Sequence, residues 1–234
     1  MTGNMVIRFL RVAYACVFMS LLAMSGLRAE TEEDGRLWAS IYLQGKLPID
    51  QLYWSMDTHP RWREEGRQFD QLILRPALFY RLDAARSVWL GFDTVFNHPQ
   101  GQPMFREQRL WQQFQWQFAP VADISFTSRT RLEQRKREDA AEIGHRLRQM
   151  VRASLPSGWQ PKLAWVVFDE VFIQLNDTDW GARSGLDQNR LFLGINWQFD
   201  AQTNMDIGYL NQWVNQRNTD RENHVLMSTV RFNF

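Results

Sequence analysis

Hydrophobic and polar residues alternate with a period of two along most of this chain. In residues 226–234 the even positions carry mainly leucine, valine and phenylalanine, whereas the odd positions include Thr229, Arg231 and Asn233. An extended strand places successive side chains on opposite faces, so this pattern gives one apolar face and one polar face. The sequence therefore predicts a β-strand that runs to the terminal aromatic residue, Phe234.

The same alternation recurs upstream. Residues 129–148 are rich in Arg, Glu, Gln and Ala, which favour helix, and a solvated helix is the alternative there. The strict alternation of residues 123–133 favours a strand instead. Eleven segments are candidate strands on this basis: 36–45, 51–62, 67–81, 87–97, 104–118, 122–136, 143–155, 162–175, 188–199, 203–214 and 223–234.

The connections between these segments alternate between short turns and longer, more polar loops. Antiparallel barrels that span bacterial outer membranes show this arrangement, and they usually have an even number of strands. We therefore expect an all-β, antiparallel transmembrane β-barrel of ten strands, formed by residues 51–234. Residues 30–50 would then form an extra strand, a plug or a periplasmic arm. Twelve strands is the alternative count.

The N-terminus has the features of a secretory signal. Arg8 and Arg11 precede an apolar run at residues 12–24, and a cleavage site follows Ala29. The run is short for a membrane span, although an uncleaved anchor is the alternative. The sequence thus predicts a signal peptide over residues 1–29 and export through the inner membrane.

Removal of this segment changes the charge and the cysteine content. It contains three arginines and no acid, so 24 basic and 26 acidic residues remain, and the basic excess that nucleic-acid binding needs is missing. Cys16, the only cysteine, lies within it, which excludes a thiol nucleophile or a cysteine metal site in the mature chain. We expect no cofactor, no metal and no nucleic-acid partner.

Charged residues gather on one face of the central segments. A charge that faces lipid at mid-membrane costs about 2–4 kcal/mol, so these residues are expected to face the lumen of the barrel. Two interpretations remain open: an ion-pair ladder that rigidifies a narrow barrel, or an arginine-lined conduit for anionic solutes. The expected network comprises Glu107, Arg109, Arg129, Arg131, Glu133, Arg135, Arg146, Arg148, Arg152, Glu170, Arg190 and Arg231.

The C-terminal strand resembles the closing strand of bacterial outer-membrane barrels, which the barrel-assembly machinery reads as an address. Val230, Phe232 and Phe234 would carry this assembly signal. The resemblance implies a location in the outer membrane of a Gram-negative organism. Outer-membrane lipid and the assembly machinery would be the partners.

Several short motifs resemble those of the DUF2490 family, an uncharacterised group of bacterial proteins thought to be outer-membrane β-barrels. They are EQRLWQQ (107–113), RTRLEQR (129–135), RLR (146–148), FDEVF (168–172), NRLFLG (189–194) and GYLNQ (208–212). The resemblance implies the fold and the location, and it supplies no catalytic residues because the family has no established activity.

Two other classes of function remain as alternatives. A lipid-modifying outer-membrane enzyme, of the lipase or lipid A hydrolase type, would need a nucleophile and a histidine base. His145 has no serine close in sequence, and His224 is separated from Ser228 by a spacing too long for a direct hydrogen bond along one strand. No catalytic residue is therefore assigned. A soluble periplasmic all-β binding protein is the other alternative.

Overall fold

The computed structural model describes residues 31–216 and 219–234, and the predicted signal segment lies outside them. The described residues form eleven strands and no helix that is long and apolar enough to cross a membrane. The strands are β1 (Thr31–Lys46), β2 (Leu52–Arg63), β3 (Gln68–Arg81), β4 (Arg86–Asn97), β5 (Phe105–Gln117), β6 (Ser125–Arg137), β7 (Ile143–Pro156), β8 (Leu163–Gln174), β9 (Gly185–Gln198), β10 (Thr203–Val214) and β11 (Asp220–Asn233).

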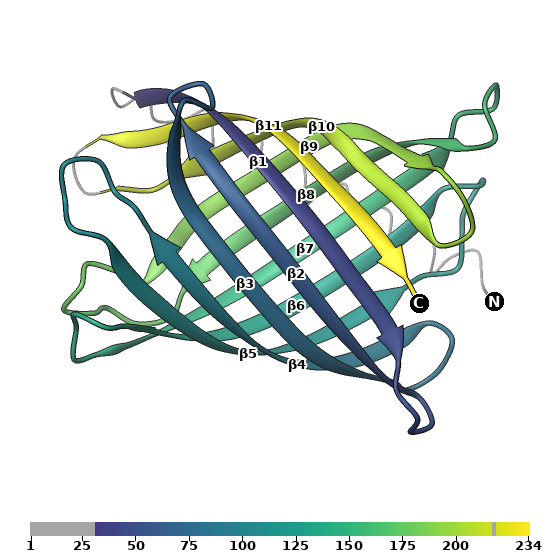
Figure 1. Ribbon diagram of the computed structural model, residues 1–234, viewed down its shortest axis with the longest axis horizontal. Coiled ribbons are helices and arrows are strands. Elements are labelled where there is room, and N and C mark those ends of the chain that lie inside the picture. The colour runs from purple at the N-terminus through teal and green to yellow at the C-terminus, as the bar shows by residue number, and fades with distance from the viewer. Residues whose placement is uncertain (1–30, 217–218) are drawn as a thin grey trace.

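The strands form one closed barrel. Each strand pairs antiparallel with its neighbours in sequence, and β1 closes the barrel by pairing with β11. This last pairing is parallel and in continuous register from Thr31 opposite Asp220 to Gln44 opposite Asn233. Figure 1 shows β1 and β11 side by side and running in the same direction. A parallel ladder satisfies the backbone groups of both edges, so an odd number of strands can close.

The expected all-β closed barrel is confirmed, but the expected counts of ten and twelve strands are wrong. All eleven segments that alternate in the sequence are strands, with ends that differ from the expected ones by a few residues. A barrel with only antiparallel pairs needs an even number of strands, so the expected count left out the first segment. That segment is β1, which pairs in parallel with β11. The helical alternative for residues 129–148 is also wrong, since β6 and β7 cover all of them except the connection at 138–142.

The two ends of the barrel differ. The end at which β11 terminates carries the connections at residues 47–51, 82–85, 118–124, 157–162 and 199–202; we call it the turn end. The opposite end, the loop end, carries the connections at residues 64–67, 98–104, 138–142 and 175–184, together with residues 215–216 and 219. β1 begins at the loop end, and the C-terminus lies at the turn end (Figure 1).

The wall has its apolar residues outside and its charged residues inside. Outward-facing Leu193 and Leu226 are 63% and 55% exposed, respectively. Inward-facing Asp93, Glu133 and Asp206 are all fully buried. Strand pleating turns alternate side chains to opposite faces, so the sequence pattern is sufficient to produce this division.

The lumen is filled on one side by an apolar cluster. Side chains from β1, β8, β9, β10 and β11 meet there, and most are at least 98% buried. The cluster consists of Trp38, Val166, Phe192, Leu210, Val225 and Met227, with Phe168 packed against it. The charged strands β5–β7 form the opposite side of the lumen, so the interior has a mainly apolar half and a mainly ionic half; Asp206 on β10 and Arg231 on β11 form an ion pair within the former.

The parallel closure can be tested with a disulfide. Ala39 and Ser228 lie opposite each other in the β1–β11 register, at a strand spacing within disulfide range. We expect Ala39→Cys with Ser228→Cys to form a disulfide under oxidising conditions, seen as a mobility change that a reductant reverses. Thr58→Cys with Ser228→Cys is the control, because β1 separates β2 from β11. A crosslink in the control pair alone would show that β2 closes the barrel.

Candidate functional site

Glu133 on β6 is the centre of the charged half of the lumen. Its carboxylate accepts hydrogen bonds from Arg146 Nη2 at 2.7 Å and from Arg148 Nη1 at 2.6 Å. Both arginines are on β7, where Arg146 is the register partner of Glu133 and Arg148 is the next inward-facing residue. Arg131 lies 3.9 Å away on the same strand. All of these side chains are buried, so the ion pairs replace the hydration that each charge loses.

Two further glutamates extend this network. Glu107 on β5 accepts from Arg109 Nε at 2.6 Å and from Arg135 Nε at 2.7 Å. Glu170 on β8 pairs with Arg129 at 2.7 Å and with Arg148 at 2.8 Å. Because Arg148 also binds Glu133, it joins two carboxylates, and ionic contacts continue from β6 to β8.

Three aspartates that are not in the expected network also pair with arginines in the lumen: Asp93 and Asp206 are buried, and Asp57 is partly buried. Arg75 Nε donates to Asp93 at 3.0 Å, and Arg75 Nη1 donates to Asp57 at 3.2 Å. Asp206 pairs with Arg152 at 2.8 Å and with Arg231 at 2.9 Å. The signal was present, since alternation within β2, β4 and β10 places these aspartates on the inward face.

Gly91 leaves room for the indole of Trp111, and this indole contacts two members of the charged network. Trp111 Nε1 donates to Asp93 at 2.6 Å, and the Arg131 guanidinium lies 3.8 Å from the indole centroid. The indole covers Gly91, where a Cβ would lie 2.1 Å from a ring carbon. A residue with a side chain at position 91 would therefore displace the indole from both contacts.

Arg190 is the member of the expected network that makes no ion pair with a described carboxylate. Its guanidinium lies 4.5 Å from the Phe172 ring centroid and 5.0 Å from that of Trp38. Arg61, which the sequence analysis did not identify, lies 3.9 Å from the same Trp38 centroid. The other eleven expected residues all lie within an ion pair.

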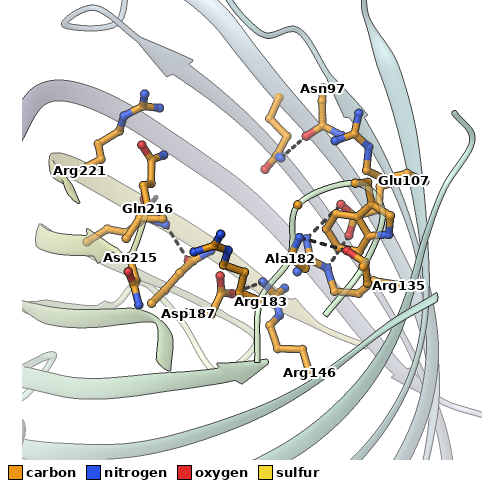
Figure 2. Close-up of a pocket in the computed structure, with 18 of the residues that line it drawn as sticks. Asn97, Glu107, Arg135, Arg146, Ala182, Arg183, Asp187, Asn215, Gln216 and Arg221 are labelled. Atoms are coloured by element: carbon orange, nitrogen blue, oxygen red, sulfur yellow. Dashed lines mark hydrogen bonds and ion pairs between the residues drawn. The ribbon is translucent and has the colours of Figure 1, made fainter. Parts of the chain in front are cut away.

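A cavity of about 1570 Å³ opens at the loop end above this network. Figure 2 shows Asn215, Gln216 and Arg221 on one side of it and Glu107 and Arg135 on the other. Among the described residues, its lining has nine arginines and six carboxylates, with no lysine or histidine. The arginines are Arg36, Arg61, Arg109, Arg135, Arg137, Arg146, Arg183, Arg190 and Arg221. The carboxylates are Glu32, Asp70, Glu107, Asp139, Asp179 and Asp187.

One carboxylate at the rim of this cavity is held in its charged form. Arg137 Nη2 donates to Asp139 at 2.6 Å, and this hydrogen bond lowers the pKa of the Asp139 carboxyl below its usual value. The nine arginines outnumber the six carboxylates even when every carboxylate is ionised, so the lining keeps a net positive charge.

The residues of the expected assembly signal lie on the outer surface of β11 and just beyond it. Val230 is the register partner of Ile41 on β1, and Phe232 is that of Leu43. Phe234 is 71% exposed and stacks on Trp54, with ring centroids 6.4 Å apart. These three residues therefore form part of the apolar outer face at the turn end.

The histidines do not assemble a serine hydrolase site. His224 Nδ1 lies 2.6 Å from the Tyr209 hydroxyl, and Ser228 makes no hydrogen bond with it. His59 is buried in the lumen, where its ring lies 6.0 Å from Trp38. Within residues 31–216 and 219–234, no serine hydroxyl is hydrogen-bonded to a histidine, and no group of three His, Cys, Asp or Glu could hold a metal ion.

The central carboxylate offers a test of the ionic network. Glu133→Gln keeps the shape of the side chain but removes the charge that Arg146 and Arg148 share, so we expect a loss of about 3–5 kcal/mol in the free energy of unfolding. Urea unfolding of the refolded protein measures this loss. Glu138→Gln is the control, because Glu138 forms a half-exposed pair with Arg106 and its loss should change stability by about 1 kcal/mol or less. Equal effects of the two substitutions would show that the buried network does not stabilise the fold.

The chain is similar in sequence to an uncharacterized protein and to a family of unknown function. An uncharacterized protein of Methylorubrum extorquens is 34% identical over 195 residues, which cover 82% of this chain and 84% of that protein. Among solved structures, OmpT of Vibrio cholerae, an outer-membrane expressed protein, aligns with a TM-score of 0.40 and 9% identity. That alignment covers 70% of this chain and 55% of OmpT. The family described as "Protein of unknown function (DUF2490)" matches residues 35–223. The expected family resemblance is therefore confirmed, and the chain belongs to the DUF2490 family.

Proposed function

We propose that this protein is an integral outer-membrane β-barrel whose lumen is closed by its ionic network, and that its primary role is structural. The observation that carries the proposal is the inverted distribution of side chains. Large apolar side chains such as Leu90, Leu193 and Leu226 are more than half exposed, whereas Glu133 and Arg146 are buried. Water-soluble monomers rarely expose apolar patches of this extent, and a bilayer would cover them.

Aromatic residues at both ends of the wall support the membrane position. Trp54, Trp116, Trp165 and Trp197 lie on strands near the turn end, and Trp62 and Trp213 lie near the loop end. Outer-membrane barrels carry such aromatic girdles at both interfaces. Each strand has 12 to 16 residues, whereas a tilted transmembrane strand needs about 9–11.

The orientation follows from the connections. The longest connection, residues 175–184, lies at the loop end. Because the longer connections of outer-membrane barrels face outside, the turn end would be periplasmic and the cavity would open to the exterior. Val230, Phe232 and Phe234 would then be presented to the barrel-assembly machinery at the periplasmic end.

The packing at mid-lumen favours a closed barrel over the anion-favouring channel. Phe172 and Phe192 are fully buried, and Trp38 and Trp111 are at least 98% buried. Together with Glu133 they project from β1, β5, β6, β8 and β9, and therefore from both halves of the lumen. A continuous water path would require these side chains to move and the ion pairs to separate.

The membrane position can be tested at an outward-facing residue. Leu193→Arg places a charge near the middle of β9, and in a bilayer we expect it to lower the free energy of unfolding by about 2–4 kcal/mol. Ile143→Arg, at the loop end of β7, is the control and should cost about 0–1 kcal/mol. Urea unfolding from lipid vesicles gives both values. A Leu193→Arg protein that is as stable as the wild type would contradict a lipid-facing wall.

The closed lumen predicts an electrically silent protein. We expect no discrete conductance steps when the refolded protein is inserted in a planar bilayer, because the ionic network and the aromatic side chains block the middle of the barrel. Heat-modifiable migration in gels would show that the inserted protein is folded. Reproducible anion-selective steps from the folded protein would overturn the structural role in favour of a channel.

A further inference from the structure

We propose that the loop-end cavity binds a small solute carrying at least two oxyanion groups, phosphate or carboxylate, through Arg61, Arg183 and Arg190. The direction from which the solute enters, the exterior, rests on the proposed outer-membrane orientation. The binding itself rests only on the residues that line the cavity.

The ion pairs of the cavity identify these three arginines. Six of its nine arginines have a carboxylate oxygen within 4.0 Å, in pairs that include Arg109 with Glu107 and Arg221 with Glu32. Arg61, Arg183 and Arg190 have no such partner in the part of the chain that the structure describes. The uncompensated charge of the cavity is therefore concentrated on three side chains.

Arg61 is the most enclosed of the three. It is only 8% exposed, and its Nη1 donates to a neutral acceptor, Gln71 Oε1, at 2.9 Å. Its buried Nε has no hydrogen-bond partner among the described residues, and neither does Nε1 of Trp38, on which its guanidinium stacks. A buried cation without a counter-charge is costly, and an anion in the cavity would compensate it.

Arg190, on β9, is a second cavity arginine without a carboxylate partner among the described residues. Its register partner on β8 is Glu170, but the Glu170 carboxylate is bound by Arg129 and Arg148. The Nη2 of Arg190 donates instead to Gln188 at 3.2 Å, and its Nε has no hydrogen-bond partner in the described chain. Because Arg190 and Arg61 both stack on Trp38, two unpaired positive charges lie against one indole.

Arg183 adds a third cation from the β8–β9 loop. The side chain is exposed, and Figure 2 shows it in the cavity beside Asp187 and Arg146. The carboxylate of Asp187 accepts from Arg146 at 2.9 Å, so Asp187 is already bound to another arginine. The loop thus adds a cation to the cavity that Arg61 and Arg190 also line.

The chemistry of the donors indicates the class of ligand. Guanidinium groups bind carboxylate and phosphate oxygens in bidentate geometry, and burial strengthens these hydrogen bonds. Three separate guanidinium groups require more than one oxyanion group for full compensation. The volume of about 1570 Å³ is sufficient for a metabolite-sized solute, and the barrel wall separates the site from lipid headgroups.

Calorimetric titration of the refolded protein in detergent micelles tests the proposal, with pyrophosphate and citrate as probes. We expect saturable binding of at least one probe that weakens as the salt concentration rises. Arg61→Gln and Arg190→Gln should each weaken binding roughly ten- to a hundredfold, and Arg183→Gln should weaken it less because its side chain is exposed. The stronger probe identifies the oxyanion as phosphate or carboxylate.

Arg81→Gln is the matched control. Arg81 also stacks on an aromatic ring, that of Tyr53 at 4.2 Å, and has no described carboxylate partner, but it lies at the turn end. Its substitution should leave the affinity unchanged. Neither Arg61 nor Arg190 pairs with a described carboxylate, so their Gln variants leave no carboxylate unpaired and should fold. Heat-modifiable migration checks this.

The possible outcomes separate this inference from the proposed function. Folded wild-type protein that binds neither probe, or binds them as well in the Arg61→Gln and Arg190→Gln variants, would overturn the anion site while the barrel proposal stands. If the wild-type protein binds a probe saturably but Leu193→Arg does not change its stability, the anion site is retained and the membrane position is overturned.

Discussion

The burial of charge inside a closed wall is the constraint on which the rest of this structure depends. Glu133, Glu107 and Glu170 each bind two arginines, and Arg148 joins two of these groups. Such contacts are favourable only when partners from several strands are held at hydrogen-bond distance, because separation of a buried pair leaves an uncompensated charge. The register of β5 to β8 and the covering of Gly91 by Trp111 meet this requirement.

The outer face is the counterpart of this interior. Strict alternation assigns every second residue to the outside, so a strand that carries Arg129, Arg131 and Glu133 inward necessarily presents its other residues outward. The same period that hides the charges therefore turns uncharged residues such as Leu132, Thr130 and Gln134 to the outer face. The two features depend on one register, because a one-residue slip of a strand would exchange its inner and outer faces.

This single pattern explains how much could be predicted from the sequence. Alternation is a local property, so it located all eleven strands and predicted one shared face for the charged residues of the expected network. Pairing between strands is not local, which is why Arg75 with Asp57 and Asp93, and the two arginines on Trp38, appeared only in the structure. The strand count was wrong for a related reason, since the direction of the closing pair depends on which two edges meet.

The parallel contact between β1 and β11 also determines where the ends of the barrel-forming chain lie. In a barrel closed by antiparallel strands, the first strand begins at the same rim at which the last strand ends, and a short linker can join them. Here Thr31 and Phe234 lie at opposite rims, separated by the full height of the wall. A circularly permuted version would therefore need an added linker that crosses the full height of the barrel to join the two ends.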